Sequence, residues 1–261
     1  VLFRERSVGE DMLDIIERRL REKRTATEPL AELQQGGRTR APMADARCDL
    51  CGACARQCPT SAITATEDWS VDVGRCIFCG DCQPACPKGA ITLSREVPAV
   101  SDRSSLILRR ALPLPELRFH LRDEVQRVLG RSLNIREVDA GSCNGCEVEV
   151  SSLSNPVYDL ERFGIRIVAS PRHADALLVT GPVTRNMRPA LMRTYRAVPE
   201  PRIVVAMGTC AISGCPFGGT YAAGAGVAEV LPVDIFIPGC PPHPRTVVLA
   251  LLEALGRTQV T

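Results

Sequence analysis

Residues 48–64 read Cys48-Asp-Leu-Cys51-Gly-Ala-Cys54-Ala-Arg-Gln-Cys58-Pro59-Thr-Ser-Ala-Ile-Thr, and residues 76–92 read Cys76-Ile-Phe-Cys79-Gly-Asp-Cys82-Gln-Pro-Ala-Cys86-Pro87-Lys-Gly-Ala-Ile-Thr. The two stretches are offset by 28 residues and are identical at nine of their 17 positions. Such an internal repeat indicates a duplicated structural unit. Each copy has the spacing C-x2-C-x2-C-x3-C-P, which predicts two equivalent loops that each present several thiols at once.

The composition is that of a globular protein. Of the 261 residues, 45% are hydrophobic, 24% are charged and 4% are aromatic, which fits a chain of one or two domains. No run of about 18 uncharged apolar residues occurs, so we expect no segment that spans a bilayer. The 32 basic and 30 acidic residues are spread along the chain, so no nucleic-acid partner is expected.

The first residues of the sequence indicate the cellular compartment. The compartment in turn decides whether the 13 cysteines are expected to form disulfides or to bind metal. Residues 1–6 contain no apolar signal region, and the pair Arg18-Arg19 is followed by charged residues where an export signal would be apolar. We therefore expect a reducing, cytoplasmic location. In such a compartment, clustered thiols favour metal binding over disulfides.

The repeated spacing is typical of iron–sulfur ligation. It resembles the two-cluster bacterial-type ferredoxin family over residues 48–93. In tandem runs of this kind, the fourth cysteine of each run binds the cluster of the other run. A zinc site would instead need two CxxC pairs for its four ligands. We therefore expect two 4Fe-4S clusters, one held by Cys48, Cys51, Cys54 and Cys86, the other by Cys76, Cys79, Cys82 and Cys58.

The C-terminal half shows a different pattern, in which short apolar runs alternate with helical segments. This pattern predicts an α/β fold whose parallel sheet has helices on both faces, a doubly wound sheet of the flavodoxin-like type. The expected strands are Leu133–Val138, Ile165–Ala169, Ala176–Thr180, Ile203–Met207 and Asp234–Ile237. The expected helices are Glu147–Leu153, Tyr158–Phe163, Arg188–Val198 and Arg245–Leu255.

Four further cysteines follow the ends of predicted strands. Loops at the carboxyl ends of parallel strands line one crevice, so these thiols are expected to meet there despite their separation in sequence. They are Cys143, Cys146, Cys210 and Cys240, and four thiols suffice for a third 4Fe-4S cluster. The alternative is that they are small buried apolar residues, which is how we interpret Cys215.

The same half resembles the small subunit of nickel–iron hydrogenases, in particular the energy-converting, complex I-related branch that includes formate hydrogenlyase. The stretches that carry the resemblance include Asp139-Ala-Gly-Ser-Cys143-Asn-Gly-Cys146-Glu147, Ser170-Pro-Arg-His173-Ala-Asp, Gly208-Thr-Cys210-Ala and Pro238-Gly-Cys240-Pro-Pro. It is also similar to the B subunit of respiratory complex I, in which the first two ligands are adjacent cysteines. Here two residues separate Cys143 from Cys146, as in the hydrogenase form.

The resemblance implies a fusion of two subunits that act as an electron-transfer subunit with three 4Fe-4S clusters. It implies a nickel–iron site on a separate large subunit, and no catalytic nickel site on this chain. Other subunits of a membrane-associated complex would hold it peripherally on the cytoplasmic face, with a donor dehydrogenase or ferredoxin as a further partner. Two alternatives stay open: a B-subunit-like part of a complex I-related quinone oxidoreductase, and a stand-alone iron–sulfur redox adaptor.

These patterns predict four segments along the chain. Residues 1–47 would hold an N-terminal helix over 11–23 and a connector, and residues 48–100 the two-cluster domain. Residues 101–131 would form a linker with a helix over 117–128, and residues 132–261 the hydrogenase small-subunit-like domain. The roles of Glu147 and His173 stay open: either could serve the cluster or the partner, and either could be structural.

Overall fold

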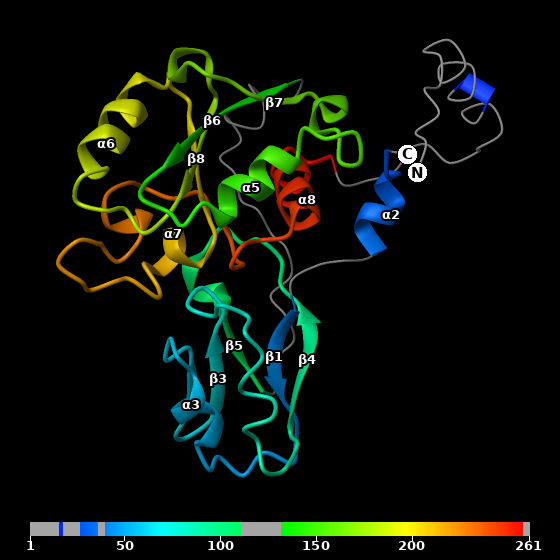
Figure 1. Cartoon of the computed structure of the whole chain (residues 1–261), viewed down its shortest axis with the longest axis vertical. Coiled ribbons are helices and arrows are strands. Elements are labelled where there is room, and N and C mark those ends of the chain that lie inside the picture. Colours follow the sequence, from blue (N-terminus) through cyan, green and yellow to red (C-terminus); the bar gives the residue numbers. More distant parts are fainter. Residues whose placement is uncertain (1–15, 18–26, 36–39, 111–131, 258–261) are drawn as a thin grey trace, which may run out of the picture.

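The protein is described by a computed structural model that covers residues 16–17, 27–35, 40–110 and 132–257. The chain forms two lobes, drawn in Figure 1 with the N-terminal lobe below and the C-terminal lobe above. The helix predicted over 117–128 lies outside the described residues, and the one predicted over 11–23 overlaps them only at residues 16–17.

The lower lobe contains two small antiparallel sheets. One pairs β1 with β4, and the other has the order β2-β3-β5. The repeat is visible in the backbone, because β2 and β4 begin at Ile63 and Ile91, which are equivalent positions of the two copies. The elements are β1 (Arg40–Ala44), α3 (Ala53–Gln57), β2 (Ile63–Ala65), β3 (Trp69–Asp72), β4 (Ile91–Glu96), η1 (Arg103–Leu106) and β5 (Ile107–Arg109).

The upper lobe is built on a five-stranded parallel sheet with the order β10-β9-β8-β6-β7. Counted within this lobe the order is 2-1-3-4-5, the flavodoxin-like doubly wound arrangement, so the predicted fold class is confirmed. Its strands are β6 (Leu133–Asp139), β7 (Ile165–Ile167), β8 (Ala176–Thr180), β9 (Ile203–Met207) and β10 (Ile235–Ile237). Its helices are α5 (Gly145–Ser152), η2 (Leu160–Phe163), η3 (Pro171–His173), α6 (Arg188–Ala197), α7 (Thr209–Ser213), η4 (Val227–Glu229) and α8 (Pro244–Ala254).

Both faces of this sheet are buried, which explains why its strands read as continuous apolar runs. On β8, Leu178 belongs to the hydrophobic cluster that contains α5 and α8 residues. Its neighbours Leu177 and Val179 belong to the cluster that contains α6 and α7 residues. All five residues of β8 are buried, and so are all five of β9.

The segment interpreted as a connector, residues 25–47, contains regular structure as well. It holds the short helix α2 (Leu30–Gln35) and the strand β1. Leu33 is fully buried in the cluster that contains α8, and Glu28 forms an ion pair of 2.5 Å with Arg245. Proline and glycine disfavour regular structure, so the composition of this segment did not predict α2 and β1. Tertiary contacts stabilise both elements.

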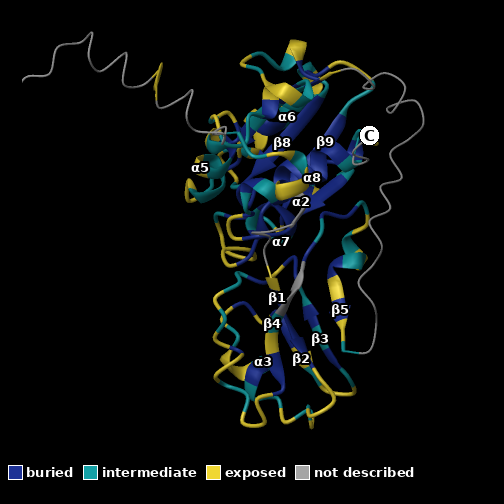
Figure 2. Ribbon diagram, turned by 90° about the vertical axis from the view of Figure 1, so that its right-hand side faces the viewer, coloured by how far each residue is buried: buried dark blue, intermediate teal, exposed yellow. Residues whose placement is uncertain are grey.

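The two lobes share one hydrophobic core. A single cluster of buried residues contains Trp69 and Val71 of the lower lobe together with Leu177 and Ala211 of the upper lobe. In Figure 2 the buried residues continue from the central sheet into the strands of the lower lobe. Past the end of β4, Val100 forms an antiparallel bridge with Phe236 of β10, so the chain crosses between the lobes along the edge of the sheet.

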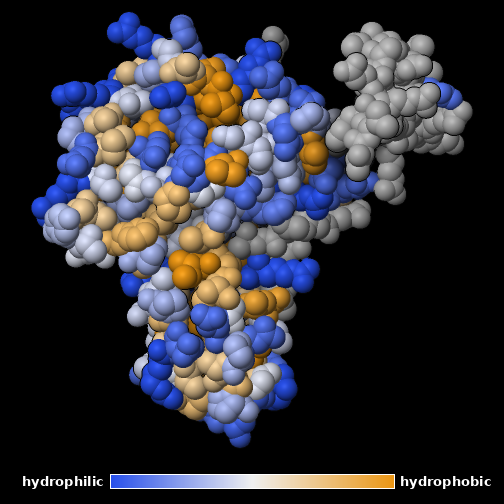
Figure 3. Space-filling view, in the orientation of Figure 1, coloured by the Kyte–Doolittle hydropathy of each residue, from blue (hydrophilic) through white to orange (hydrophobic). Residues whose placement is uncertain are grey.

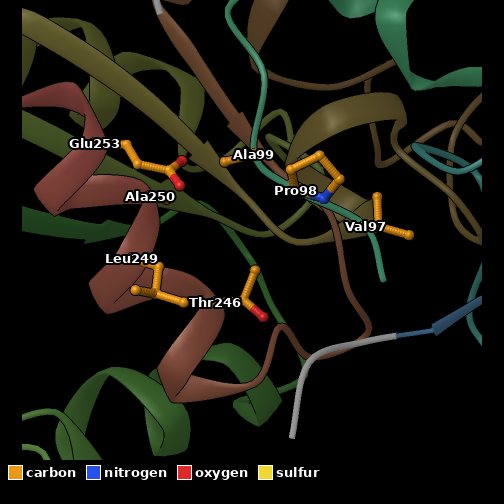
Figure 4. A pocket seen from close by; sticks show the side chains of 7 residues that line it. All are labelled: Val97, Pro98, Ala99, Thr246, Leu249, Ala250 and Glu253. Atoms are coloured by element: carbon orange, nitrogen blue, oxygen red, sulfur yellow. The ribbon is translucent and has the colours of Figure 1, made fainter. Parts of the chain in front are cut away.

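A small, partly open pocket lies where this crossing segment meets α8. Figure 4 shows Val97, Pro98 and Ala99 of the crossing segment facing Thr246 and Glu253 of α8. The Thr246 hydroxyl is buried and has no hydrogen-bond partner. The cysteines lie elsewhere, in the loops where the lobes meet and in the lower lobe, and they form the candidate sites.

Candidate metal centre

Four thiols from both repeat copies line one pocket of the lower lobe. The cysteines of this pocket are Cys58, Cys76, Cys79 and Cys82. Cys58 belongs to the first copy and the other three to the second, which is the crossed set that the spacing predicts. The remaining walls are apolar except for the backbone, with Pro42, Ile63, Phe78, Gly80 and Leu93.

The two cysteine loops have the same unusual backbone. Leu50 and Phe78, each two residues after the first cysteine of its copy, have φ angles of 60° and 58°. Gly52 and Gly80 follow with φ angles of 71° and 84°. Left-handed conformations at non-glycine residues are costly and gather at functional sites. The repeated strain indicates that each loop curls back on its own thiols.

Backbone N–H groups point at the cysteine sulfurs in this lobe. The N–H of Ala62 donates to Cys58 Sγ at 3.3 Å, and the equivalent Ala90 N–H donates to Cys86 Sγ at 3.3 Å. The N–H of Phe78 donates to Cys76 Sγ at 3.4 Å. Such bonds stabilise negative charge on sulfur, as an iron–sulfur cluster requires.

Two arginines and the single tryptophan lie against the loop of the first copy. Arg110 donates to the Cys48 carbonyl at 3.0 Å, and Arg56 donates to the Cys51 carbonyl at 3.1 Å. The indole of Trp69 is fully buried, and its N–H has no hydrogen-bond partner among the described residues. Burial raises the pKa of the Cys54 thiol, and the adjacent Trp69 side chain opposes the rise. An unpaired N–H beside a thiol fits a sulfur acceptor.

The thiols of the crossed pocket have shifted pKa values. Burial, together with the neighbouring thiols, raises the pKa of Cys76 to about 12 and that of Cys82 to about 11. For Cys58 burial also acts upward, but the Thr60 hydroxyl and the Ala62 N–H hold its pKa below the ordinary value. A metal that binds Cys76 and Cys82 as thiolates must therefore displace their protons.

Crossed ligation can be distinguished by experiment from the alternative in which the four cysteines of each repeat copy bind one cluster by themselves. Replacing Cys58 by alanine is expected to remove the same cluster as replacing Cys76, because the two thiols share a pocket. Both variants should bind about eight iron atoms, against about 12 expected for the unmodified chain, and their residual EPR spectra should coincide. If Cys58→Ala instead matched Cys48→Ala, each run would hold its own cluster and the crossed assignment would be wrong.

Thiols from three loops gather at the carboxyl edge of the parallel sheet. A Cβ atom added to Gly208 would lie 2.7 Å from Cys146 Sγ, and one added to Gly145 would lie 3.5 Å from Cys143 Sγ. Burial raises the pKa of the Cys146 thiol, Glu147 raises it further, and Cys210, Cys240 and Cys143 add to the rise. These four thiols therefore lie near one another, as the strand-end argument predicts.

A hydrogen-bond network shapes the loop that carries Cys143. Asp139 Oδ1 accepts from the N–H groups of Gly141 and Ser142, both at 2.7 Å. The Ser142 hydroxyl donates to Glu147 Oε2 at 2.7 Å, and the Thr180 hydroxyl donates to Glu147 Oε1. Both carboxylate oxygens of Glu147 are thus engaged in holding the loop, which gives this residue a structural role beside any other.

Two other residues lie in different surroundings. Cys215 is buried; burial raises the pKa of the Cys210 thiol, and Cys240, Cys143 and then Cys215 add to the rise. His173 is exposed on η3, three residues before β8 begins, at the sheet edge opposite to the cysteines. The structure therefore does not bring His173 to the thiol site.

The chemistry of these residues fits iron–sulfur clusters. The described part of the chain holds no group of three or more His, Cys, Asp or Glu side chains close enough to bind one metal ion. A cuboidal cluster does not need such a group, because each of its four thiolates binds a different iron atom. The N–H donors to sulfur, the left-handed loops and the side-chain-free Gly208 all suit a bulky anionic cluster.

Comparisons with known proteins place this chain in a family. The family described as "NADH ubiquinone oxidoreductase, 20 Kd subunit" matches residues 143–254, and the "4Fe-4S dicluster domain" matches residues 47–90. The "Probable membrane-bound hydrogenase subunit mbhJ" of Pyrococcus furiosus is 43% identical over 131 residues, which are 50% of this chain and 78% of that protein. The chain belongs to the NADH ubiquinone oxidoreductase 20 kDa subunit family.

Two further relatives of this 20 kDa subunit family member have names that point to different activities. The "Formate hydrogenlyase subunit 7" of Escherichia coli is 46% identical over 126 residues, which are 48% of this chain and only 49% of that protein, about half its length. An NADH-quinone oxidoreductase subunit of Carboxydothermus hydrogenoformans is 44% identical over 115 residues, covering 44% of this chain and 69% of the relative. The expected fusion of a dicluster domain with a domain of the complex I-related type is thereby confirmed.

Several residues of this family member escaped the sequence reasoning. Asp139 and Ser142 stand in the stretch that carries the hydrogenase resemblance, but their hydrogen bonds in the Cys143 loop were not predicted, and neither was Trp69 beside Cys54. Asp139 and Ser142 stand directly after a predicted strand and before Cys143, which was an available signal for a structured turn. Trp69, the single tryptophan, had no spacing to reveal it.

Proposed function

We propose that the chain is the electron-transfer subunit of a multi-subunit nickel–iron hydrogenase. It would relay single electrons to or from a nickel–iron site on a partner large subunit, where dihydrogen and protons are interconverted. When bound, three 4Fe-4S clusters would supply reversible one-electron carriage. The twelve cysteines of the two repeat copies and the sheet edge would hold them, and only Cys215 has no ligand role.

One observation carries this proposal: the thiols at the sheet edge lie directly beside the crossed pocket of the lower lobe. Cys210 is the second residue of α7, and the Ser213 hydroxyl of the same helix donates to the Gly74 carbonyl at 2.7 Å. Gly74 stands two residues before Cys76, a wall of the crossed pocket. The sheet-edge thiols and the crossed pocket are therefore adjacent sites, which supports a path for electrons from one to the other.

The spacing of the first two ligands at the sheet edge favours hydrogenase over quinone oxidoreductase. Sequence identity does not separate the two, since both kinds of relative are 43–46% identical to this chain. In the complex I branch, family resemblance places these ligands side by side. Here Asn144, in a left-handed conformation with a φ of 69°, and Gly145 separate Cys143 from Cys146.

The partner large subunit would dock on the face around Cys143. Cys143 and Cys240 are exposed, and Val148 of α5 is 59% exposed although it is apolar. Figure 3 shows small hydrophobic areas scattered among hydrophilic residues on the face of the molecule that it draws. An apolar surface beside exposed thiols is typical of a site that a partner protein covers. The nickel site itself would lie on the partner, because the assigned ligand roles leave no pair of thiols on this chain.

Attachment to a membrane would come through partner subunits. Within the described ranges, no helix combines the length and apolar character needed to cross a bilayer. The relative from Pyrococcus furiosus carries "membrane-bound hydrogenase" in its name. We propose by analogy a peripheral position on the cytoplasmic face, with a donor dehydrogenase or ferredoxin meeting the lower lobe.

Affinity purification of the tagged chain from its native cells tests this function. We expect a nickel-containing large subunit to co-purify and the preparation to oxidise dihydrogen. A nickel-free preparation with quinone reductase activity would refute the hydrogenase assignment and favour the complex I-like alternative. A stable chain that purifies without any partner would instead favour the stand-alone redox adaptor.

A further inference from the structure

Thr209 connects the two lobes through its side chain. It is 1% exposed and is the first residue of α7. Its hydroxyl oxygen lies 2.8 Å from the carbonyl of Cys76 in the lower lobe and 3.1 Å from the carbonyl of Gly239. The Gly239 carbonyl already accepts the backbone N–H of Thr209 at 2.8 Å. The Thr209 hydroxyl therefore donates its hydrogen bond to the Cys76 carbonyl.

The position of this hydroxyl relative to the cysteines is specific. Thr209 directly precedes Cys210, Gly239 directly precedes Cys240, and Cys76 is itself a wall of the crossed pocket. The Thr209 side chain thus contacts the backbone of Cys76 in the crossed pocket. It also lies beside the backbone of Cys210 and Cys240 at the sheet edge. A displacement of Thr209 would change the spacing between the two sites rather than the shape of either alone.

A second contact from the same helix supports this arrangement. The Ser213 hydroxyl, four residues later and so on the same face of α7, donates to the Gly74 carbonyl. A Cβ atom at Gly74 would lie 2.8 Å from the Ile212 side chain, so the loop packs tightly against α7. The loop from Gly74 to Cys76 is therefore held along its length by one short helix.

We propose that Thr209 is the positioning residue that sets the separation between the crossed site of the lower lobe and the sheet-edge site. The inference rests on the proposed function, in which electrons pass between these two sites. Electron tunnelling weakens steeply with distance, so a fixed separation sets the rate. The hydroxyl acts by holding the Cys76 backbone against α7, and no bond or proton changes during its action.

The chemistry of the side chain allows a sharp comparison. Valine has the shape of threonine but no donor, so Thr209→Val leaves the buried Cys76 carbonyl without this bond. Thr209→Ser keeps the donor and removes only a methyl group. Thr194→Val is the matched control, because the Thr194 hydroxyl donates to the Ala190 carbonyl of its own helix α6 and, among the described residues, to no other group.

The experiment uses the full chain with two measurements. The first is amide hydrogen exchange at residues 74–80 in chain freed of iron, where Thr209→Val should exchange about tenfold faster than the unmodified chain. The second is the EPR spectrum of anaerobically reconstituted, dithionite-reduced protein. There the magnetic interaction between neighbouring reduced clusters should change in Thr209→Val, with the iron content still about 12 per chain. Thr209→Ser and Thr194→Val should match the unmodified chain in both measurements.

The outcomes separate this inference from the proposed function. Unchanged exchange and an unchanged spectrum in Thr209→Val would overturn the positioning role. A variant that loses iron from one site, while Thr209→Ser retains it, would support the role because the hydroxyl alone differs. If the unmodified chain bound fewer than three clusters, the proposed function would fail. The exchange experiment would still decide whether Thr209 holds the loop.

Discussion

Replacing Cys240 by alanine is expected to remove one whole cluster and leave the other two intact. The reconstituted variant should bind about eight iron atoms per chain instead of about 12, and the EPR signals of the ferredoxin-type pair should persist. The reason is that Cys240 lies near Cys143 at the sheet edge, away from the pocket lined by Cys58 and Cys76. Cys240 is also exposed, so its truncation leaves no internal cavity.

Cys215→Ala is the matched control for this experiment. Cys215 is buried beside Cys210 but has no ligand role in our assignment. The control should therefore keep about 12 iron atoms, at a modest cost in stability of about 1 kcal/mol for the lost packing. Loss of a cluster in Cys215→Ala together with retention in Cys240→Ala would mean that the fourth ligand has been assigned to the wrong cysteine.

Gly208→Ala is expected to abolish the sheet-edge cluster without touching any cysteine. The φ angle at Gly208 is 89°, a conformation that costs other residues about 1–3 kcal/mol. The new methyl group would also lie 2.7 Å from Cys146 Sγ, so it would push that sulfur out of position. The measurement is again iron content with EPR, and the expected loss is about four iron atoms.

Gly219→Ala separates the two causes. Gly219 has a φ of 79°, yet a Cβ atom there would meet nothing within 4 Å. This variant should lose stability through backbone strain while keeping all its iron. If Gly208→Ala also kept about 12 iron atoms, the close approach of the backbone to Cys146 would have no bearing on the cluster.

Much of the upper lobe could be predicted from the sequence, because burial on both faces makes a strand apolar throughout. The predicted range Ala176–Thr180 is β8 itself, and Ile203–Met207 is β9. The segment Tyr158–Phe163 was predicted as a helix and contains only the 3-10 turn Leu160–Phe163. Helix α7, with five residues, is too short to show a helical period.

In the lower lobe the cysteine loops could be predicted from the sequence, but the sheets around them could not. The repeat and its spacing predict the cysteine loops, since three thiols in one tight turn need that local pattern. The sheets around the loops depend on partners far away in sequence: β1 pairs with β4, and β3 pairs with β5. These strands begin at Arg40 and end at Arg109, on either side of the predicted range of residues 48–100, whose boundaries stay a prediction.

The contacts between lobes could not be predicted at all. Nothing in the residue pattern joins Thr209 to Cys76, which are 133 positions apart. The grouping of the four sheet-edge cysteines could be predicted, because the loops that follow parallel strands all lie at the same edge of the sheet. The distance between this edge and the cysteine loops of the lower lobe depends on how the two lobes pack. That distance could be obtained only from the structure.

The most direct test of the account is a Mössbauer spectrum of the full chain, produced with iron-57 and purified without oxygen, together with total iron and acid-labile sulfide. We expect about 12 iron and about 12 sulfide per chain, with all iron in 4Fe-4S clusters. Replacing any of the four sheet-edge cysteines should lower both numbers to about eight. An unmodified chain holding about eight iron atoms, or isolated iron or zinc ions bound by thiolates, would contradict the account.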